Sequence, residues 1–199
     1  MLGLRFLVNG IEIAAVSNEG RNIISAYISG DVIGSELGEA HMTGGFYDNQ
    51  ENTSHRIWLD HHVIYEQDEI EIQFSDKVVT SGRGMTIEEF SEVHENDADS
   101  DIEEDIYDWL DRQPKFRKCF SFSISGANNK LSHYEASDDA HSFHFGVMWK
   151  LTNPNEASVR LSSSTLENMK KNESSTTHTA FRLSLDESVR FRVNCSEIK

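Results

Sequence analysis

The spacing most suggestive of chemistry in this chain is a run of alternating carboxylates, Asp97, Asp99 and Asp101. Carboxylates at alternating positions of a tight loop can surround one Ca²⁺ ion, as they do in helix–loop–helix calcium sites. The sixth position of such a loop requires glycine for its sharp turn, and this chain has Ile102 there. The twelfth position requires a bidentate glutamate, and this chain has Asp108. The pattern therefore favours an acidic connection between two helices over a calcium site.

Nine histidines offer imidazole ligands, but their spacing does not predict a zinc site. His61 and His62 are adjacent in an expected strand, so their side chains point to opposite faces. His141 and His144 are three residues apart in another expected strand and likewise face opposite ways. The chain contains neither HExxH nor CxxC. A zinc site would have to assemble from distant segments, and we expect no metal and no cofactor.

Motifs for nucleophilic catalysis and nucleotide binding are also absent from the sequence. The run Ser81-Gly82-Arg83-Gly84 is typical of a loop, and the chain has no GxSxG elbow. Its glycines lack the GxGxxG and GxxxxGK[ST] spacings. Cys119 and Cys195 lie far apart in no metal-binding or redox pattern, and we expect free thiols. The chain is therefore expected not to be an enzyme, with a metal-dependent hydrolase as one alternative.

The formal charge of −16 narrows the classes of partner. Residues 85–112 carry twelve acidic side chains and one basic one. Nucleic-acid binding needs clustered lysine and arginine for phosphate, and attraction to an anionic membrane surface needs the same. We therefore expect neither kind of partner. A basic protein suits this charge, because opposite charges steer association.

The acidic block has the sequence pattern of two capped helices. Thr86 and Glu89 form one capping box, and Ser100 and Glu103 form another. Apolar residues follow each box at helical spacing, which predicts one buried face per helix. The carboxylates then lie on an outer surface. We expect that surface to bind a partner through Glu88, Glu92, Glu103, Glu104, Asp105, Asp108 and Trp109.

These features favour a non-enzymatic protein-binding module that masks a basic partner. In charge and size the chain resembles the acidic immunity proteins of bacterial toxin systems. The resemblance implies a nuclease toxin as partner, or another nucleic-acid-processing enzyme. A second alternative is a structural subunit whose acidic helices mediate assembly, including a homodimer. No apolar run approaches the ~20 residues that a membrane span needs, and we expect a cytoplasmic protein.

The rest of the chain is rich in strand patterns. Asn9-Gly10 between apolar runs predicts a hairpin. Residues 30–53 have the composition of a long loop, with a short strand near Phe46-Tyr47 as an alternative, and residues 164–177 also have the composition of a loop. We expect an α+β fold, mostly antiparallel, with two similar β-rich units at 1–84 and 114–199 flanking the helical connection 85–113. The sequence leaves open whether these ranges form one domain. Three segment pairs in the same order favour a tandem duplication: Phe6–Gly10 with Phe122–Gly126, Thr53–Trp58 with Thr176–Phe181, and Ile70–Phe74 with Val189–Val193.

Overall fold

The chain begins with the hairpin that Asn9-Gly10 predicts. Strands β1 (Gly3–Val8) and β2 (Ile11–Ser17) pair antiparallel on either side of this turn. Asn9 has a φ of 52° and Gly10 a φ of 78°, the positive values that a type I′ turn requires. Alternate side chains of β1 are buried, so one face of the hairpin enters the core.

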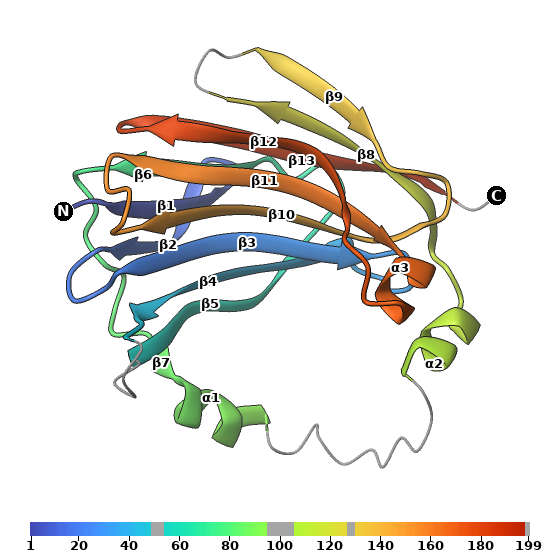
Figure 1. Cartoon of the computed structure of the whole chain (residues 1–199), viewed down its shortest axis with the longest axis horizontal. Coiled ribbons are helices and arrows are strands. Elements are labelled where there is room, and N and C mark those ends of the chain that lie inside the picture. The colour runs from blue at the N-terminus through green and yellow to red at the C-terminus, as the bar shows by residue number, and fades with distance from the viewer. Residues whose placement is uncertain (49–53, 95–105, 127–129, 198–199) are drawn as a thin grey trace.

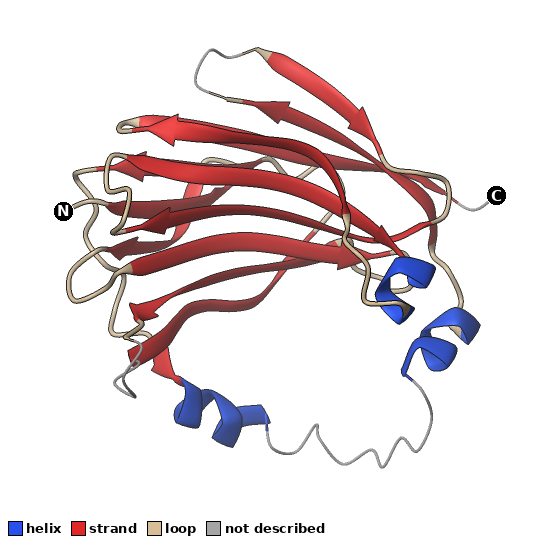
Figure 2. Ribbon diagram, viewed as in Figure 1, coloured by secondary structure: helices blue, strands red, loops and turns tan. Residues whose placement is uncertain are grey.

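The computed structural model describes residues 1–48, 54–94, 106–126 and 130–197. Strands make up most of these residues, in two antiparallel sheets that lie one behind the other in Figures 1 and 2. The six-stranded sheet has the order β2-β1-β6-β13-β8-β9, and the seven-stranded sheet has the order β12-β11-β10-β3-β4-β5-β7. The six-stranded sheet is completed by β6 (Ile70–Ser75), β8 (Arg117–Ser125), β9 (Leu131–Glu135) and β13 (Glu187–Glu197). The seven-stranded sheet consists of β3 (Ile23–Asp31), β4 (Gly38–Phe46), β5 (Ser54–Ile64), β7 (Met85–Thr86), β10 (Ala140–Lys150), β11 (Glu156–Thr165) and β12 (Thr176–Ser184).

One hydrophobic core fills the space between the sheets. Phe145 of β10 stacks on Phe191 of β13, with ring centroids 4.1 Å apart and planes 7° apart. Phe143 of β10 meets Phe120 of β8 edge to face at 5.0 Å. Such aromatic pairs add to the stabilisation from area burial. The mostly antiparallel β fold expected from the sequence is therefore confirmed.

In each sheet the strands of the two ends of the chain lie on opposite sides, three and three in the six-stranded sheet, and three and four (β7 included) in the seven-stranded sheet. Strands β1, β2 and β6 occupy one half of the six-stranded sheet, and β8, β9 and β13 occupy the other. In the seven-stranded sheet, β3, β4 and β5 lie on one side of β10, β11 and β12. The antiparallel pairs β6–β13 and β3–β10 join the two sets. Each sheet is thus continuous across both ends of the chain.

The prediction of a long loop over residues 30–53 is wrong, because β4 occupies nine of these residues. By composition alone, the glycines of this strand indicate a loop. They are present because backbones approach closely: a Cβ on Gly38 would lie 2.3 Å from the carbonyl oxygen of Ser29, and one on Gly45 would lie 2.1 Å from that of Ser54. Glycine in a strand often marks such a close approach.

The described ranges contain three short helices, which lie beside the seven-stranded sheet (Figure 2). They are α1 (Ile87–His94), α2 (Ile106–Arg112) and α3 (Leu166–Lys170). The last one corrects the expected loop over 164–177, because Thr165 caps it by accepting a hydrogen bond from the amide of Asn168 at 3.1 Å. No helix in the described ranges combines the length and apolar character needed to cross a membrane.

Candidate metal centre

The outer face of the seven-stranded sheet, turned away from the six-stranded sheet, carries a cluster of histidines and carboxylates. Glu39 and His41 lie two residues apart on β4, so they share one face. The intervening Ala40 and the following Met42 are fully buried on the other face. Strand alternation therefore places a carboxylate and an imidazole side by side on the outer face.

A β-bulge in β5 adds two more polar side chains to this cluster. Ala40 pairs with His62 and Met42 pairs with Leu59, so Asp60 and His61 lie together opposite the single residue His41. A bulge of this kind re-aims side chains and is frequent beside functional sites. His61 has a φ of 47°, a value uncommon outside glycine. The bulge lets two adjacent residues reach the same group of side chains.

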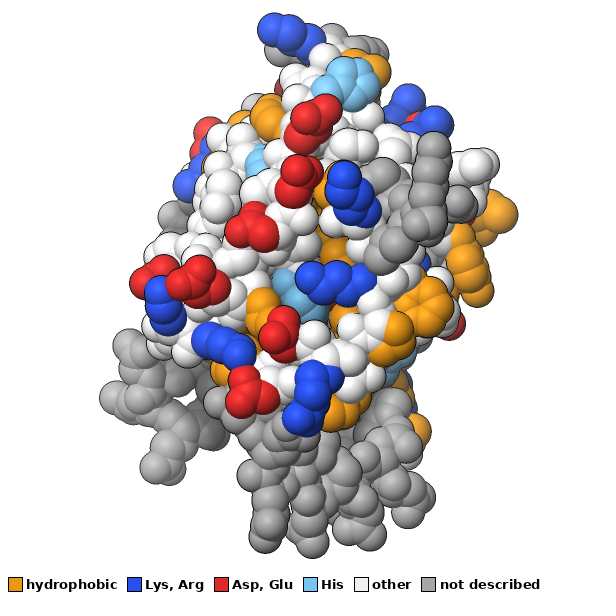
Figure 3. All heavy atoms as spheres, turned by 90° about the vertical axis from the view of Figure 1, so that its right-hand side faces the viewer, with side chains coloured by type: hydrophobic (Ala, Val, Ile, Leu, Met, Phe, Trp, Pro, Cys, Tyr) orange, Lys and Arg blue, Asp and Glu red, His pale blue; other side chains and the backbone are white. Residues whose placement is uncertain are grey.

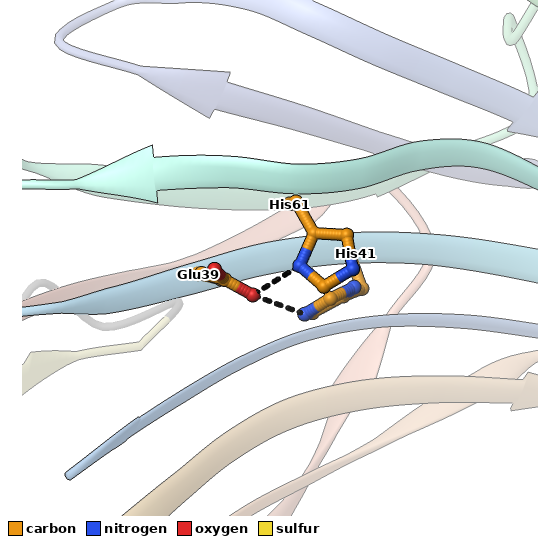
Figure 4. Close-up of side chains that lie close together, drawn as sticks. All are labelled: Glu39, His41 and His61. Carbon is orange, nitrogen blue, oxygen red and sulfur yellow. Dashed lines mark hydrogen bonds and ion pairs between the residues drawn. The ribbon is translucent and has the colours of Figure 1, made fainter. Parts of the chain in front are cut away.

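The three potential ligand side chains converge on one point (Figure 4). The Oε2 atom of Glu39 is hydrogen-bonded to Nδ1 of His61 and lies 3.8 Å from Nε2 of His41. One ligand atom from each residue lies within 4.8 Å of the others. Ligands bound to Zn²⁺ at about 2.0–2.2 Å in tetrahedral geometry lie roughly 3.4 Å apart. Small side-chain rotations would bring these atoms to that spacing.

Asp60 supports both imidazoles from the other side. Its Oδ1 atom lies 3.4 Å from Nδ1 of His41 and 3.5 Å from Nε2 of His61. Each ring therefore has one nitrogen toward Glu39 and the other toward Asp60. A carboxylate behind a ligating histidine fixes its ring orientation and raises its basicity as a ligand. Asp60 is 12% exposed at its side chain, which suits a supporting role.

The two imidazoles differ in their protonation behaviour. The hydrogen bond with Glu39 raises the pKa of His61 above its ordinary value. Burial lowers the pKa of His41, although Asp60 partly opposes that effect. At neutral pH His41 thus favours the neutral form that binds metals, whereas at His61 a metal ion competes more strongly with a proton.

Aromatic rings continue the cluster in both directions across the sheet. Tyr27 of β3 stacks on His41 with centroids 4.9 Å apart, and His144 of β10 lies 5.3 Å from Tyr27 on the next strand. On the other side, Phe90 of α1 stacks on His61 at 6.5 Å. A row of rings therefore crosses four strands and ends under α1. It limits the ring orientations available to both histidines.

The cluster borders a groove made of two hollows on the same face. The first hollow, about 560 Å³, is lined in part by Glu39 and lies near α2 and α3. The second, about 790 Å³, lies over β10, β11 and β12. The hollows share His144, Ser162 and Ser164, so they form one continuous depression. A metal ion at the cluster would therefore sit at its edge.

The structure separates the residues expected to bind a partner. Glu88 and Glu92 lie on α1, which packs against β5 and β7. Asp108 and Trp109 lie on α2, which contacts α3 near a different end of the sheet (Figure 1). The described residues do not show α1 and α2 as one packed pair. Three further expected residues, Glu103, Glu104 and Asp105, lie outside the described ranges, as do Asp97, Asp99 and Asp101 of the calcium-like pattern.

The end of the molecule that bears α2 and α3 is mixed in charge. In Figure 3, acidic and basic side chains of the described residues are interspersed there. Asp108 forms an ion pair with Lys170 of α3 at 2.6 Å. The hydrogen bond from Lys170 lowers the pKa of Asp108. Part of the acidity expected to face a partner is thus engaged within the chain.

Comparison with protein-family models, curated proteins and solved structures finds no match for this chain. Its function must therefore be inferred from the arrangement of its own residues. Spacing alone did not point to Glu39, His41, Asp60 or His61 as a group. The available signal was the Glu-x-His alternation at 39–41, which the expectation of a loop over those residues concealed.

Proposed function

We propose that the protein binds a divalent metal ion of the zinc class through Glu39, His41 and His61. The observation that carries the proposal is the convergence of these three ligand groups, with Asp60 behind both imidazoles. Two histidines and one glutamate form a ligand set used by zinc sites that keep an open position. Nitrogen and oxygen ligands also suit other first-row divalent metals, but zinc binds such sites strongly.

The location of the site supports a role in ligand binding. The side chains of Glu39 and His61 are 37% and 50% exposed, so a bound ion would keep contact with solvent. Glu39 also lines the first hollow. An oxygen atom of a molecule in the groove could then take the open coordination position. A metal-dependent hydrolase would use that position for water. That function requires the same metal binding, so the titration described next also tests its first requirement.

Metal titration of the purified protein tests the proposal. Protein stripped of metal should bind one equivalent of Zn²⁺ in isothermal titration calorimetry. The variants H41A, H61A and E39Q should each lose this binding. Asp60→Asn should keep the stoichiometry and weaken affinity about 10–100-fold, because it removes only the supporting carboxylate. His133→Ala, an exposed histidine on β9, is the matched control. Equal Zn²⁺ binding by wild type and H41A/H61A would refute the site.

A second candidate function is the capture of a basic protein partner, for example a nuclease toxin. The observation that favours it is exposed apolar surface beside carboxylates on both acidic helices. Val93 is 65% exposed next to Glu92, and Trp109 is 38% exposed next to Asp108. Tryptophan is enriched among the few residues that carry most of the binding energy in protein interfaces. This proposal uses the outer carboxylates of α1 and α2, although Phe90 of α1 also stacks on His61 of the metal site.

Charge reversal tests this second function. Wild-type protein, E88K/E92K and a control with Glu135→Lys on β9 would be used to isolate partners from the native cell. A basic partner recovered with the wild type and the control, but lost with E88K/E92K, supports the proposal. Recovery that is equal for all three proteins would rule out α1 as the docking surface.

We also propose that the two β-rich ranges are similar units derived from a tandem duplication. The division of strands within both sheets supports this, because β1, β2 and β6 match β8, β9 and β13 in order. The three repeated segments fall on the matching strands β1 and β8, β5 and β12, and β6 and β13. A cytoplasmic setting is proposed as well. The chain has two cysteines, Cys119 and Cys195, far apart in the sequence and in no disulfide framework, which supports it.

A further inference from the structure

The two hollows of the groove carry opposite charges. The charged residues that line the first hollow are Asp31, Glu36 and Glu39, all of them acidic. The charged residues that line the second hollow are Arg160 and Arg182, both of them basic. We call them the acidic hollow and the basic hollow. A ligand that fills both would need a cationic group at one end and an anionic group at the other.

Two of the cations near the acidic hollow, Arg117 and Lys170, are engaged elsewhere. Burial lowers the pKa of the His141 ring, and Lys115 lies close enough to add to that effect. Arg117 donates hydrogen bonds to the carbonyl oxygens of Gly34 and Ser35, at 2.6 and 3.0 Å. Lys170 pairs with Asp108. Asp31 is held in place by the backbone amides of residues 33 and 34, both 2.8 Å from its Oδ1 atom. Its other carboxylate oxygen accepts no hydrogen bond recorded within the described part of the chain.

His141 gives the acidic hollow a second, independent feature. It lines this hollow, is 3% exposed, and neither ring nitrogen has a hydrogen-bond partner among the described residues. A neutral imidazole offers one donor and one acceptor, and buried polar groups are nearly always paired. Both ring nitrogens are closed to solvent, so a ligand ammonium would bind Asp31 directly and would reach His141 after a turn of its ring toward the hollow. The chemistry of this hollow therefore fits a primary amine.

The basic hollow fits a carboxylate. The recorded hydrogen bonds of Arg160 go to hydroxyl groups of Thr177, at 2.9 Å, and Ser175, at 3.5 Å. A guanidinium has five N–H donors in a planar fork, so donors remain for a bidentate carboxylate. Met148 and Phe181 supply apolar surface in the same hollow. Hydroxyls shared by the two hollows, those of Ser162 and Ser164, can bond to polar groups between the two ends.

Strand register sets the length of the ligand. Asp31 pairs with Ser142, and Arg160 pairs with Gly146, so the two charged residues are offset by four residues along β10 and by two strands. Rises of about 3.4 Å per residue and spacings of about 4.8 Å per strand put their Cα atoms roughly 17 Å apart. An extended chain spans about 3.3–3.6 Å per residue. Roughly five residues of extended peptide cover this distance.

We propose that the groove binds a short linear peptide with free termini. Its ammonium group lies in the acidic hollow against Asp31 and His141, and its carboxylate lies on Arg160. The backbone amides between them bond to the serine hydroxyls of the groove. The proposal is independent of metal binding, because Asp31, His141 and Arg160 are not ligands of the proposed site.

Pentaalanine with free termini is the probe. Protein-observed ¹H–¹⁵N NMR should show saturable shifts for residues of β10 and β11 at millimolar peptide, with EDTA present. Acetylation of the peptide N-terminus and amidation of its C-terminus should each weaken binding tenfold or more. Absence of saturable shifts for the free peptide, or equal affinity for free and doubly blocked peptides, would overturn the proposal.

Paired variants assign each terminus to its hollow. Arg160→Gln should weaken binding of the free peptide tenfold or more and leave binding of the amidated peptide unchanged. Asp31→Asn keeps the acceptor for the two loop amides, and it should affect the free peptide but not the acetylated one. Arg190→Gln on the six-stranded sheet is the matched control. Loss of binding in R160Q that is equal for free and amidated peptides would contradict the assignment.

Discussion

At the scale of single residues, the bulge in β5 is the feature with the clearest functional meaning. His61 holds a left-handed backbone angle, which costs energy in a non-glycine residue. This backbone angle is part of the bulge that places Asp60 and His61 beside His41 on one face of the sheet. A residue that serves binding at a backbone cost should be replaceable without loss of stability.

His61→Gly tests this expectation. Glycine adopts positive φ at no steric cost, so the variant should unfold with a free energy within about 1 kcal/mol of the wild type, while Zn²⁺ binding is lost. His41→Gly is the comparison. It removes a mostly buried ring that stacks on Tyr27, and glycine in a strand adds conformational entropy to the unfolded chain, so the variant should lose about 1–2 kcal/mol of stability. Urea denaturation of metal-free protein measures both. A loss for H61G as large as that for H41G would contradict the argument.

Cys195 offers a second prediction at this scale. Burial raises the pKa of its thiol from an ordinary 9.0 to about 11. At pH 8 the thiolate fraction is therefore about 100-fold lower than for an unperturbed thiol, partly offset by the greater nucleophilicity of a more basic thiolate. Alkylation by iodoacetamide should be about tenfold slower than for a model thiol and should accelerate up to pH 11. Peptide mass spectrometry measures the alkylation of Cys195, with the variant C195S as control. Alkylation as fast as that of the model thiol at pH 8 would show the pKa is not raised.

At the scale of elements, helix α1 depends on its capping box. The amide of Thr86 donates to Glu89 Oε2 at 2.9 Å, and the amide of Glu89 donates to Thr86 Oγ1 at 3.2 Å. Thr86→Ala should destabilise the helix by about 1 kcal/mol, within a range of roughly 0.5–2. Hydrogen exchange of the α1 amides measures this local change. Unaltered protection in T86A would mean that packing on β5 and β7 alone holds the helix.

The capping box also shows which elements a sequence can predict. Thr86–Glu89 and the Asn9-Gly10 turn are local patterns, complete within a few residues, and both predictions are confirmed. The prediction for residues 30–53 missed strand β4 because its glycines are required by close contacts with neighbouring strands. A local sequence pattern contains no information about those contacts. The candidate metal site was not predicted for the same reason. His41 and His61 meet only through the pairing of β4 with β5 and its bulge.

At the scale of the whole molecule, the two ends of the chain depend on each other. Strand β6 pairs with β13 in one sheet, and β3 pairs with β10 in the other. The buried residues of both ends belong to one core. Unfolding should therefore be a single cooperative transition. Calorimetry measures this as equal calorimetric and van't Hoff enthalpies, and two separate transitions would contradict it.

Isolated fragments extend this prediction. A fragment of residues 1–84 would expose the edges of β3 and β6, which lie in the middle of the intact sheets. Such edges, with fully buried side chains like Ile24 and Ile72, promote pairing between chains. The fragment should self-associate in light scattering, and adding residues 114–199 should compete by restoring the β6–β13 and β3–β10 pairs. A monomeric fragment with its own cooperative melt would mean that each end folds alone, and that the central pairs only join two finished units.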